Sequence, residues 1–107
     1  MSQAVLIQTT TSSRQDAERL AEVIVQRQLA GCVQIVGPIV SVYRWQDAVQ
    51  KKEEFLVSIK TVDRAFASLS QLIREHHSYD VPEIILLPIQ DGSRDYLDWL
   101  KQQVTTE

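Results

Sequence analysis

The sequence predicts an α+β domain with the element order β-α-β-β-α-β and a further helix at its end. Three observations lead to this prediction. Apolar residues recur at helical spacing between Ser12 and Gly31 and again after Asp63, segments rich in β-branched residues surround both stretches, and the segments are separated by polar or turn residues. A length of 107 residues is typical of one domain, so the whole chain, 1–107, is taken as a single unit.

The first strand is expected within residues 3–10, around an apolar run that three threonines follow. Ser12 begins a Ser-x-x-Gln pattern with Gln15, which predicts a capping box at the start of the first helix. Apolar residues from Ala17 onwards then repeat at helical spacing. Gly31 is expected to end this helix, because glycine is preferred just beyond a helix C-terminus.

The stretches "CVQIVGPIVSVYRW" and "EEFLVSIKT" are predicted to be two long strands of one hairpin. Gly37-Pro38 interrupts the first of them, and since proline cannot donate to a sheet ladder, a bend or bulge is expected there. The segment "QDAVQKK" between the strands carries no tight-turn signal, so the hairpin is expected to have a loose tip.

The second half should supply a helix, a strand and a last helix. Asp63 is expected to cap the second helix, whose apolar stripe reaches towards His76. The run "PEIILLPI" is nearly all apolar, as in a strand covered on both faces. Pro88 suggests that the strand ends there or lies at an edge of the sheet. Ser93 should cap a short helix that buries Tyr96, Leu97 and Leu100. The resulting order is the split βαβ, or ferredoxin-like, arrangement.

Composition excludes several classes of protein. Hydrophobic residues make up 44% and charged residues 23%, which is typical of a folded globular chain. The net charge of −3 argues against nucleic acid as a partner, because nucleic-acid binders need a basic surface. Neither a membrane span nor a signal peptide is expected. The single cysteine, Cys32, excludes an internal disulfide and fits a reducing cytoplasm.

Both histidines stand side by side in "REHHSYDVPEI". Imidazole is a common ligand of Cu²⁺ and Zn²⁺. Adjacent residues on a regular helix point about 100° apart, however, so His76 and His77 can share one ion only if the helix frays between them. His76 lies on the apolar stripe, so a buried, hydrogen-bonded histidine is favoured there over a metal ligand. His77 lies outside the stripe, near Tyr79 and Glu83, where both a functional and a structural role are open.

Three further polar residues are candidates. Glu83 stands beside Pro82 at the entry to an apolar strand, where it could accept a proton, hold a metal or form an ion pair. Lys60 lies on a predicted strand and is either a ligand contact or a charge that protects an edge. Cys32 could be a soft ligand for Cu⁺ or a small buried hydrophobe. No Cys-x-x-Cys, His-x-x-x-His or phosphate-binding glycine pattern occurs.

Tyr43 and Trp45 are placed at the outer part of the predicted hairpin. A single subunit has little with which to cover them, and an exposed aromatic patch on a monomer is a liability. The hairpin could fold back over its own sheet, but burial by a neighbouring chain is favoured. The sequence therefore predicts an oligomer with Tyr43 and Trp45 at the interface.

The segments "LAGCVQIV", "SVYRW", "IKT", "HHSYDVPEI" and "YLDWL", in this order and spacing, resemble the CutA divalent-cation tolerance family over nearly the whole chain. The resemblance implies a ferredoxin-like subunit in a homotrimer, similar to the PII signalling trimers. It also implies an association with copper or other divalent cations, for which the matching residues are His76, His77 and Cys32, with Tyr79 and Glu83 nearby.

Two positions depart from the family pattern. Some members carry a second cysteine on the first strand, proposed as a copper ligand, where this chain has Gln8-Thr9-Thr10. The family often has glycine two residues after the hairpin tryptophan, where this chain has Asp47. A thiol-rich site is therefore in question, and the tip of the hairpin is expected to differ in shape.

The leading hypothesis is a cytoplasmic homotrimer for divalent-cation tolerance that binds copper weakly through His77, with His76 and Glu83 or Cys32. The alternative is a PII-like regulatory trimer in which Lys60, Tyr79, Glu83 and Trp45 line a cleft between subunits for a small ligand, or in which that surface meets a partner protein. An enzyme is not expected, because no paired acid and base or activated nucleophile is evident in the sequence.

Overall fold

A computed structural model describes residues 2–105 of the chain. Four strands form one antiparallel sheet in the order β2-β3-β1-β4: β1 (Ala4–Thr11), β2 (Cys32–Trp45), β3 (Ala48–Val62) and β4 (Ile85–Pro88). The helices are α1 (Arg14–Gln26), α2 (Phe66–His76), which a short 3₁₀ turn (Asp63–Ala65) precedes, and α3 (Arg94–Gln103). The predicted element order and the α+β class are confirmed.

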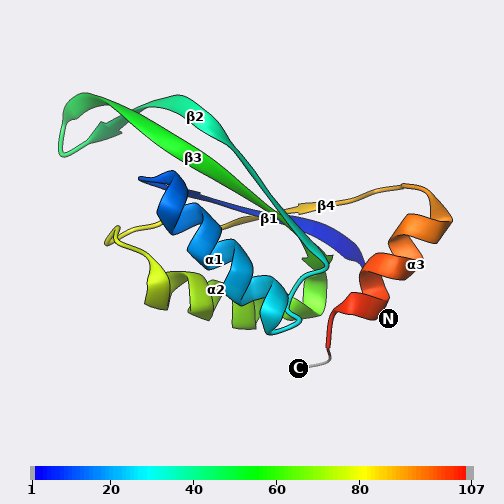
Figure 1. Ribbon diagram of the computed structural model, residues 1–107. Helices are drawn as coiled ribbons and strands as arrows, with labels where there is room; N and C mark the ends of the chain where they lie inside the picture. Colours follow the sequence, from blue (N-terminus) through cyan, green and yellow to red (C-terminus); the bar gives the residue numbers. More distant parts are fainter. Residues whose placement is uncertain (1, 106–107) are drawn as a thin grey trace.

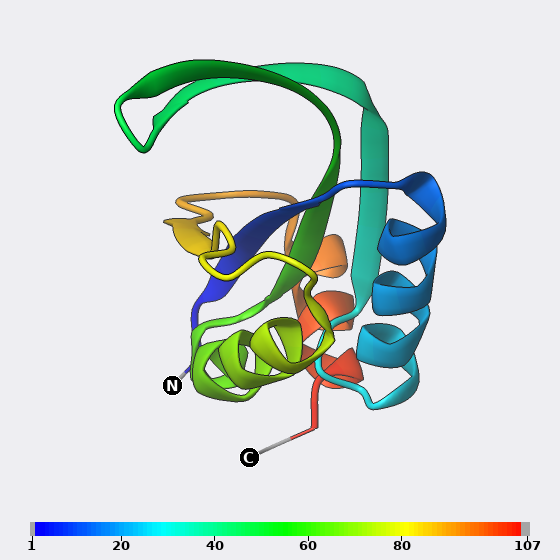
Figure 2. The same ribbon diagram turned by 90° about the vertical axis from the view of Figure 1, so that its left-hand side faces the viewer.

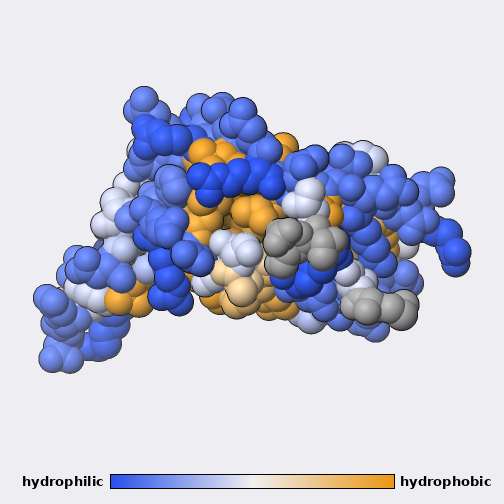
Figure 3. Space-filling model, turned by 90° about the horizontal axis from the view of Figure 1, so that it is seen from below, coloured by the Kyte–Doolittle hydropathy of each residue, from blue (hydrophilic) through white to orange (hydrophobic). Residues whose placement is uncertain are grey.

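Helices α1 and α2 lie together on one face of the sheet, and the β2–β3 hairpin extends beyond this body and curls over (Figures 1 and 2). The core lies between the two helices and the sheet, where Ile7, Ile24, Ile59, Leu69 and Ile73 are fully buried. Figure 3 shows the molecule from below, with hydrophobic residues near the centre of this face and hydrophilic residues around them. Within residues 2–105, no helix is long and apolar enough to cross a membrane.

The bulge predicted at Gly37-Pro38 is present. Pairing between β2 and β3 shifts between Val36 and Ile39, so that Val36 faces Leu56 while Ile39 faces Glu54. Two residues of β2, Gly37 and Pro38, thus lie opposite the single residue Phe55 of β3, which is the geometry that bends a strand pair. The bulge is the point at which the hairpin departs from the body of the sheet.

The tip of the hairpin is tight, and the prediction of a loose loop is wrong. Strand pairing continues to Trp45 opposite Ala48, and only Gln46 and Asp47 connect the strands. Both have positive φ, 51° and 65°, as a type I′ turn requires. The turn was missed because Gln-Asp is not one of the Asn-Gly or Asp-Gly pairs that usually mark it. Asp47 occupies a backbone conformation that glycine adopts more easily.

The caps of α1 also differ from the prediction. Ser13, and not Ser12, accepts the hydrogen bond from the N–H of Asp16. The helix ends at Gln26, earlier than the end expected at Gly31, and Gln28 takes the left-handed conformation, with φ 59°. Gly31 instead donates its N–H to the carbonyl of Lys60 on β3. A Cβ added to Gly31 would come within 2.7 Å of the Leu100 side chain. Close packing is therefore the reason for this glycine.

In the second half, Asp63 does not cap a helix with its side chain; its carboxylate accepts from the N–H of Gln3. Ser93 caps α3 as predicted. Leu100 is fully buried, whereas Tyr96 on the same helix is 40% exposed. β4 is an edge strand, so Pro88 is compatible with it, but within one chain β4 is exposed and not covered on both faces. The rest of the chain therefore leaves the apolar residues of β4 uncovered.

Candidate functional site

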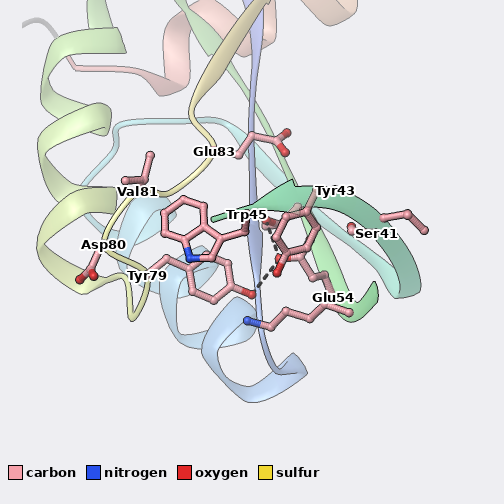
Figure 4. A pocket seen from close by; sticks show the side chains of 11 residues that line it. Ser41, Tyr43, Trp45, Glu54, Tyr79, Asp80, Val81 and Glu83 are labelled. Atoms are coloured by element: carbon pink, nitrogen blue, oxygen red, sulfur yellow. Dashed lines mark hydrogen bonds between the residues drawn. The ribbon is translucent and has the colours of Figure 1, made fainter. Parts of the chain in front are cut away.

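A cavity of about 580 Å³ lies beneath the curled hairpin. Its walls come from the outer parts of β2 and β3, from the segment that follows α2, and from the end of β1. The lining residues include Thr10, Ser41, Tyr43, Trp45, Lys52, Glu54, Tyr79, Asp80 and Glu83. Figure 4 shows the labelled residues of this group.

A buried carboxylate lies at the centre of one wall. Glu54 is only 7% exposed, and its Oε2 accepts hydrogen bonds from the hydroxyls of Tyr79, at 2.7 Å, and Thr10, at 3.3 Å. Burial alone would raise the pKa of Glu54, but hydrogen bonds from Ser41, Tyr79 and Thr10 and the charge of Lys52 outweigh it and hold the pKa below its ordinary value. Glu54 is therefore charged near neutral pH.

Tyr79 connects the segment after α2 to the hairpin. Burial, the hydrogen bond to Glu54 and the negative charge of that carboxylate all raise the pKa of Tyr79. The ammonium of Lys52 lies 4.0 Å from the centroid of the Tyr79 ring, a cation–π distance. Glu54, Tyr79 and Lys52 thus form one charged network that fixes the hairpin against the body of the subunit.

His77 is half-buried beside this network. Its Nδ1 accepts from the N–H of Tyr79 at 3.0 Å, and its Nε2 lies 2.6 Å from the carbonyl oxygen of Thr10. A carbonyl can only accept, so Nε2 carries the proton and the ring is satisfied at both nitrogens as a neutral imidazole. A metal ion could bind His77 only by breaking one of these bonds.

His76 has the opposite environment. Its side chain is exposed, and Nδ1 lies 3.0 Å from the carbonyl of Leu72, one turn earlier in α2. The expectation of a buried His76 is wrong, because α2 ends at this residue and the last buried residue of its apolar stripe is Ile73. Donation from Nδ1 to Leu72 leaves Nε2 as the ring nitrogen that can bind a metal.

The remaining metal candidates do not converge with the histidines. Cys32 begins β2 opposite Lys60, at the end of the sheet away from the hairpin tip. Glu83 lies on the pocket wall and accepts from the side-chain amide of Gln8 at 3.2 Å. In the part of the chain that the structure describes, 2–105, no group of three or more His, Cys, Asp or Glu side chains could hold a metal ion.

Of the four residues predicted to line a cleft between subunits, three line this pocket within one chain and one lies elsewhere. Trp45, Tyr79 and Glu83 all line the pocket. Lys60 does not: it pairs with Leu6 and Cys32, and its ammonium lies 5.8 Å from the ring of Tyr96 on α3. The lysine of the pocket is Lys52, eight residues earlier on the same strand.

Sequence reasoning missed Lys52 and Glu54 as site residues. The signal was present in "KKEEF", where a carboxylate directly precedes the buried Phe55 on a predicted strand. Two adjacent residues of a regular strand face opposite sides, so only one of them was expected inside. Glu54 nevertheless is buried on the face of β3 opposite to Phe55, where Tyr79 and Thr10 contact it beneath the hairpin.

With this geometry in place, comparison with known proteins identifies the family. The family model described as CutA1 divalent ion tolerance protein matches residues 5–103. The chain belongs to the CutA1 family. The resemblance expected from the sequence motifs is confirmed, and membership links the chain with divalent-cation tolerance.

Relatives with known structures share the whole subunit. The chain is 43% identical over 102 residues to the divalent-cation tolerance protein CutA of Thermus thermophilus, covering 95% of this chain and 97% of the relative. The crystal structure of CutA1 from Oryza sativa matches with a TM-score of 0.95 at 38% identity, covering 98% of this chain and 96% of that one.

Other relatives are longer than this chain. It is 33% identical to human protein CutA over 93 residues, covering 87% of this chain. This chain spans about half the length of that relative and of the chloroplastic CutA of Arabidopsis thaliana, 52% and 54% respectively. The CutA1 domain is therefore the part that these proteins share with it.

Proposed function

We propose that this CutA1 chain is the subunit of a cytoplasmic homotrimer that serves divalent-cation tolerance by binding metal ions weakly, and that it does not act as an enzyme. The observation that carries the assembly is the pair of open sheet edges. Within residues 2–105 the sheet ends in β2 on one side and in β4 on the other. Exposed edges are templates for pairing with another chain.

The residues near both edges support such pairing. On β4, Ile85, Leu86 and Leu87 are 37–44% exposed, and on the outer part of β2 Tyr43 and Trp45 are 39% and 47% exposed. Joining the β2 edge of one copy to the β4 edge of the next is a head-to-tail contact, and such contacts close into rings when the rotation allows. The number three follows from the family resemblance.

Sedimentation of the purified chain at micromolar concentration tests this assembly. The expected result is a single species of three chain masses. Its apparent stability should rise with protein concentration, because folded chains associate with one another and unfolded chains do not. A stable single-chain species at the same concentration would remove the proposed trimer.

For the metal, His76 is the best supported ligand. Its imidazole is exposed, and its Nδ1 is oriented by Leu72, which leaves Nε2 for an ion such as Cu²⁺. No group of three or more His, Cys, Asp or Glu side chains in residues 2–105 could hold a metal ion, and a single imidazole without further ligands implies weak binding. Binding should weaken as pH falls, because the ligand is the neutral imidazole.

Titration with Cu²⁺ of His76→Ala and His77→Ala, made separately, tests this assignment. We expect His76→Ala to lose most of the binding and His77→Ala to keep it, because both nitrogens of His77 already have protein partners. The two variants remove the same group from adjacent positions and control for each other. Equal curves for wild type and His76→Ala would exclude His76 as the ligand.

The pocket chemistry supports a binding role over catalysis. A carboxylate whose pKa is lowered is a weak proton acceptor, and a phenol whose pKa is raised is a reluctant proton donor. Glu54 and Tyr79 are thus shifted away from the values that general acid–base chemistry needs near neutral pH. Cys32, as the single thiol of the chain, fits the reducing cytoplasm.

A further inference from the structure

The pocket beneath the hairpin carries an excess of negative charge. Among its lining residues the carboxylates are Glu54, Asp80 and Glu83, and the one ammonium is that of Lys52. A cavity lined mainly by one sign of charge concentrates ligands of the opposite sign. Phosphates and other anions are therefore disfavoured, and cations are favoured.

Aromatic rings make up much of the remaining wall. Tyr43 and Trp45 come from β2 and Tyr79 from the segment after α2, and Figure 4 shows the three side chains around the pocket. The face of an aromatic ring attracts a cation through its quadrupole, most strongly for tryptophan and tyrosine. Rings from two separate parts of the chain, together with carboxylates, form the type of cage that recognises ammonium groups.

One cation already lies in this cage. The ammonium of Lys52 is 4.0 Å from the centroid of the Tyr79 ring, and its charge also acts on Glu54. Lys52 thus shows that an ammonium group is stable at a position beside the Tyr79 ring. It also competes for that position with any cation from solution.

An organic cation fits the pocket better than a metal ion. In residues 2–105 no three ligating side chains are close enough together to hold a metal. A volume of about 580 Å³ is in the range of small-molecule sites. An ammonium carrying methyl groups is weakly hydrated and can use both the rings and the carboxylates, whereas a divalent ion demands several oxygen ligands.

We propose that this pocket binds a small organic cation of the methylated-ammonium class between Tyr43, Trp45 and Tyr79, and that Lys52 is an internal competitor for the site. This inference goes beyond metal tolerance. It rests on the proposed assembly, because Tyr43 and Trp45 are also proposed interface residues, so a neighbouring chain lies beside the site in the trimer. It uses neither histidine, so the copper result and the result described next are independent of each other.

Calorimetric titration of the full chain with choline tests the site. The control ligand is 3,3-dimethyl-1-butanol, which has the same shape without the charge. We expect saturable binding of choline and binding of the neutral alcohol weaker by about threefold or more, as expected for a cation–π contribution. Inorganic phosphate and Ca²⁺, added separately at matched ionic strength, should not displace choline. Equal binding of the alcohol, displacement by either ion or no choline binding would overturn the proposal.

Lys52→Gln and Lys51→Gln form the matched pair of variants. Both remove one positive charge from adjacent positions of β3, but only Lys52 lines the pocket. Lys52→Gln should tighten choline binding by about threefold or more, because it frees the ring of Tyr79 and increases the negative charge of the cavity. Lys51→Gln should leave it unchanged. An unchanged or weaker affinity in Lys52→Gln, with its sedimentation behaviour preserved, would contradict the role of Lys52.

Discussion

Replacing Leu86 by proline is expected to convert the proposed trimer to single chains while leaving each chain folded. Antiparallel ladders alternate between residues that bond to the neighbour and residues that face outward. The backbone N–H of Ile89 donates to the carbonyl of Ala4 on β1. The backbone N–H groups of Leu87 and Ile85, two and four residues earlier, therefore also point towards β1. The backbone N–H of Leu86 points towards the open edge of the sheet. Pro88 faces the same edge but has no N–H.

The expected result follows from that position. Proline is tolerated on an edge strand where its nitrogen faces solvent, but it removes a ladder hydrogen bond where another strand pairs with it. Sedimentation should therefore show the mass of one chain for Leu86→Pro, while circular dichroism still reports the α+β fold. Leu86→Ala keeps the N–H and should remain largely trimeric. A Leu86→Pro variant that stays trimeric would mean that β4 is not the edge used in assembly.

The fold could be predicted from the sequence because its signals are local and mutually consistent. Leu69, Leu72 and Ile73 repeat at helical spacing and are buried, and Val57 and Ile59 alternate on β3 and are buried. Each of these patterns reports which face of an element meets the core. The order of elements then restricts the topology to a small number of choices.

The candidate site could be predicted only in part, because it depends on register. Trp45, Tyr79 and Glu83 were identified from their unusual positions, but Lys52 and Glu54 were not. The bulge at Gly37-Pro38 in β2 and the tight turn at Gln46-Asp47 set the register that places Tyr43 and Trp45 on the same face of the hairpin as Lys52 and Glu54. A shift of one residue in a strand moves every side chain to the other face. The sequence indicated the bulge but not the turn, and so it did not determine which lysine enters the pocket.

Replacing Glu54 by alanine should destabilise the chain by about 2–4 kcal/mol, because it leaves hydroxyl donors without their acceptor and one ammonium without its nearby opposite charge in a largely buried site. Tyr79 and Thr10 both donate to Glu54 Oε2, and Lys52 interacts with its charge. Glu54→Gln is the matched control. It retains an oxygen that can accept from Tyr79 and should cost about 1 kcal/mol.

Urea unfolding at a fixed chain concentration measures both values, since assembly makes stability depend on concentration. The same carboxylate gives a pH dependence with a defined sign. Because the folded pKa of Glu54 lies below its ordinary value of 4.5, its contribution is fully present above about pH 4.5 and is lost as pH falls through the folded pKa. The stability gap between wild type and Glu54→Gln should therefore be constant from neutral pH down to about 5 and narrow below it. A gap that widened on acidification would show that Glu54 is held in its protonated form, and that the negative charge attributed to the pocket is not there.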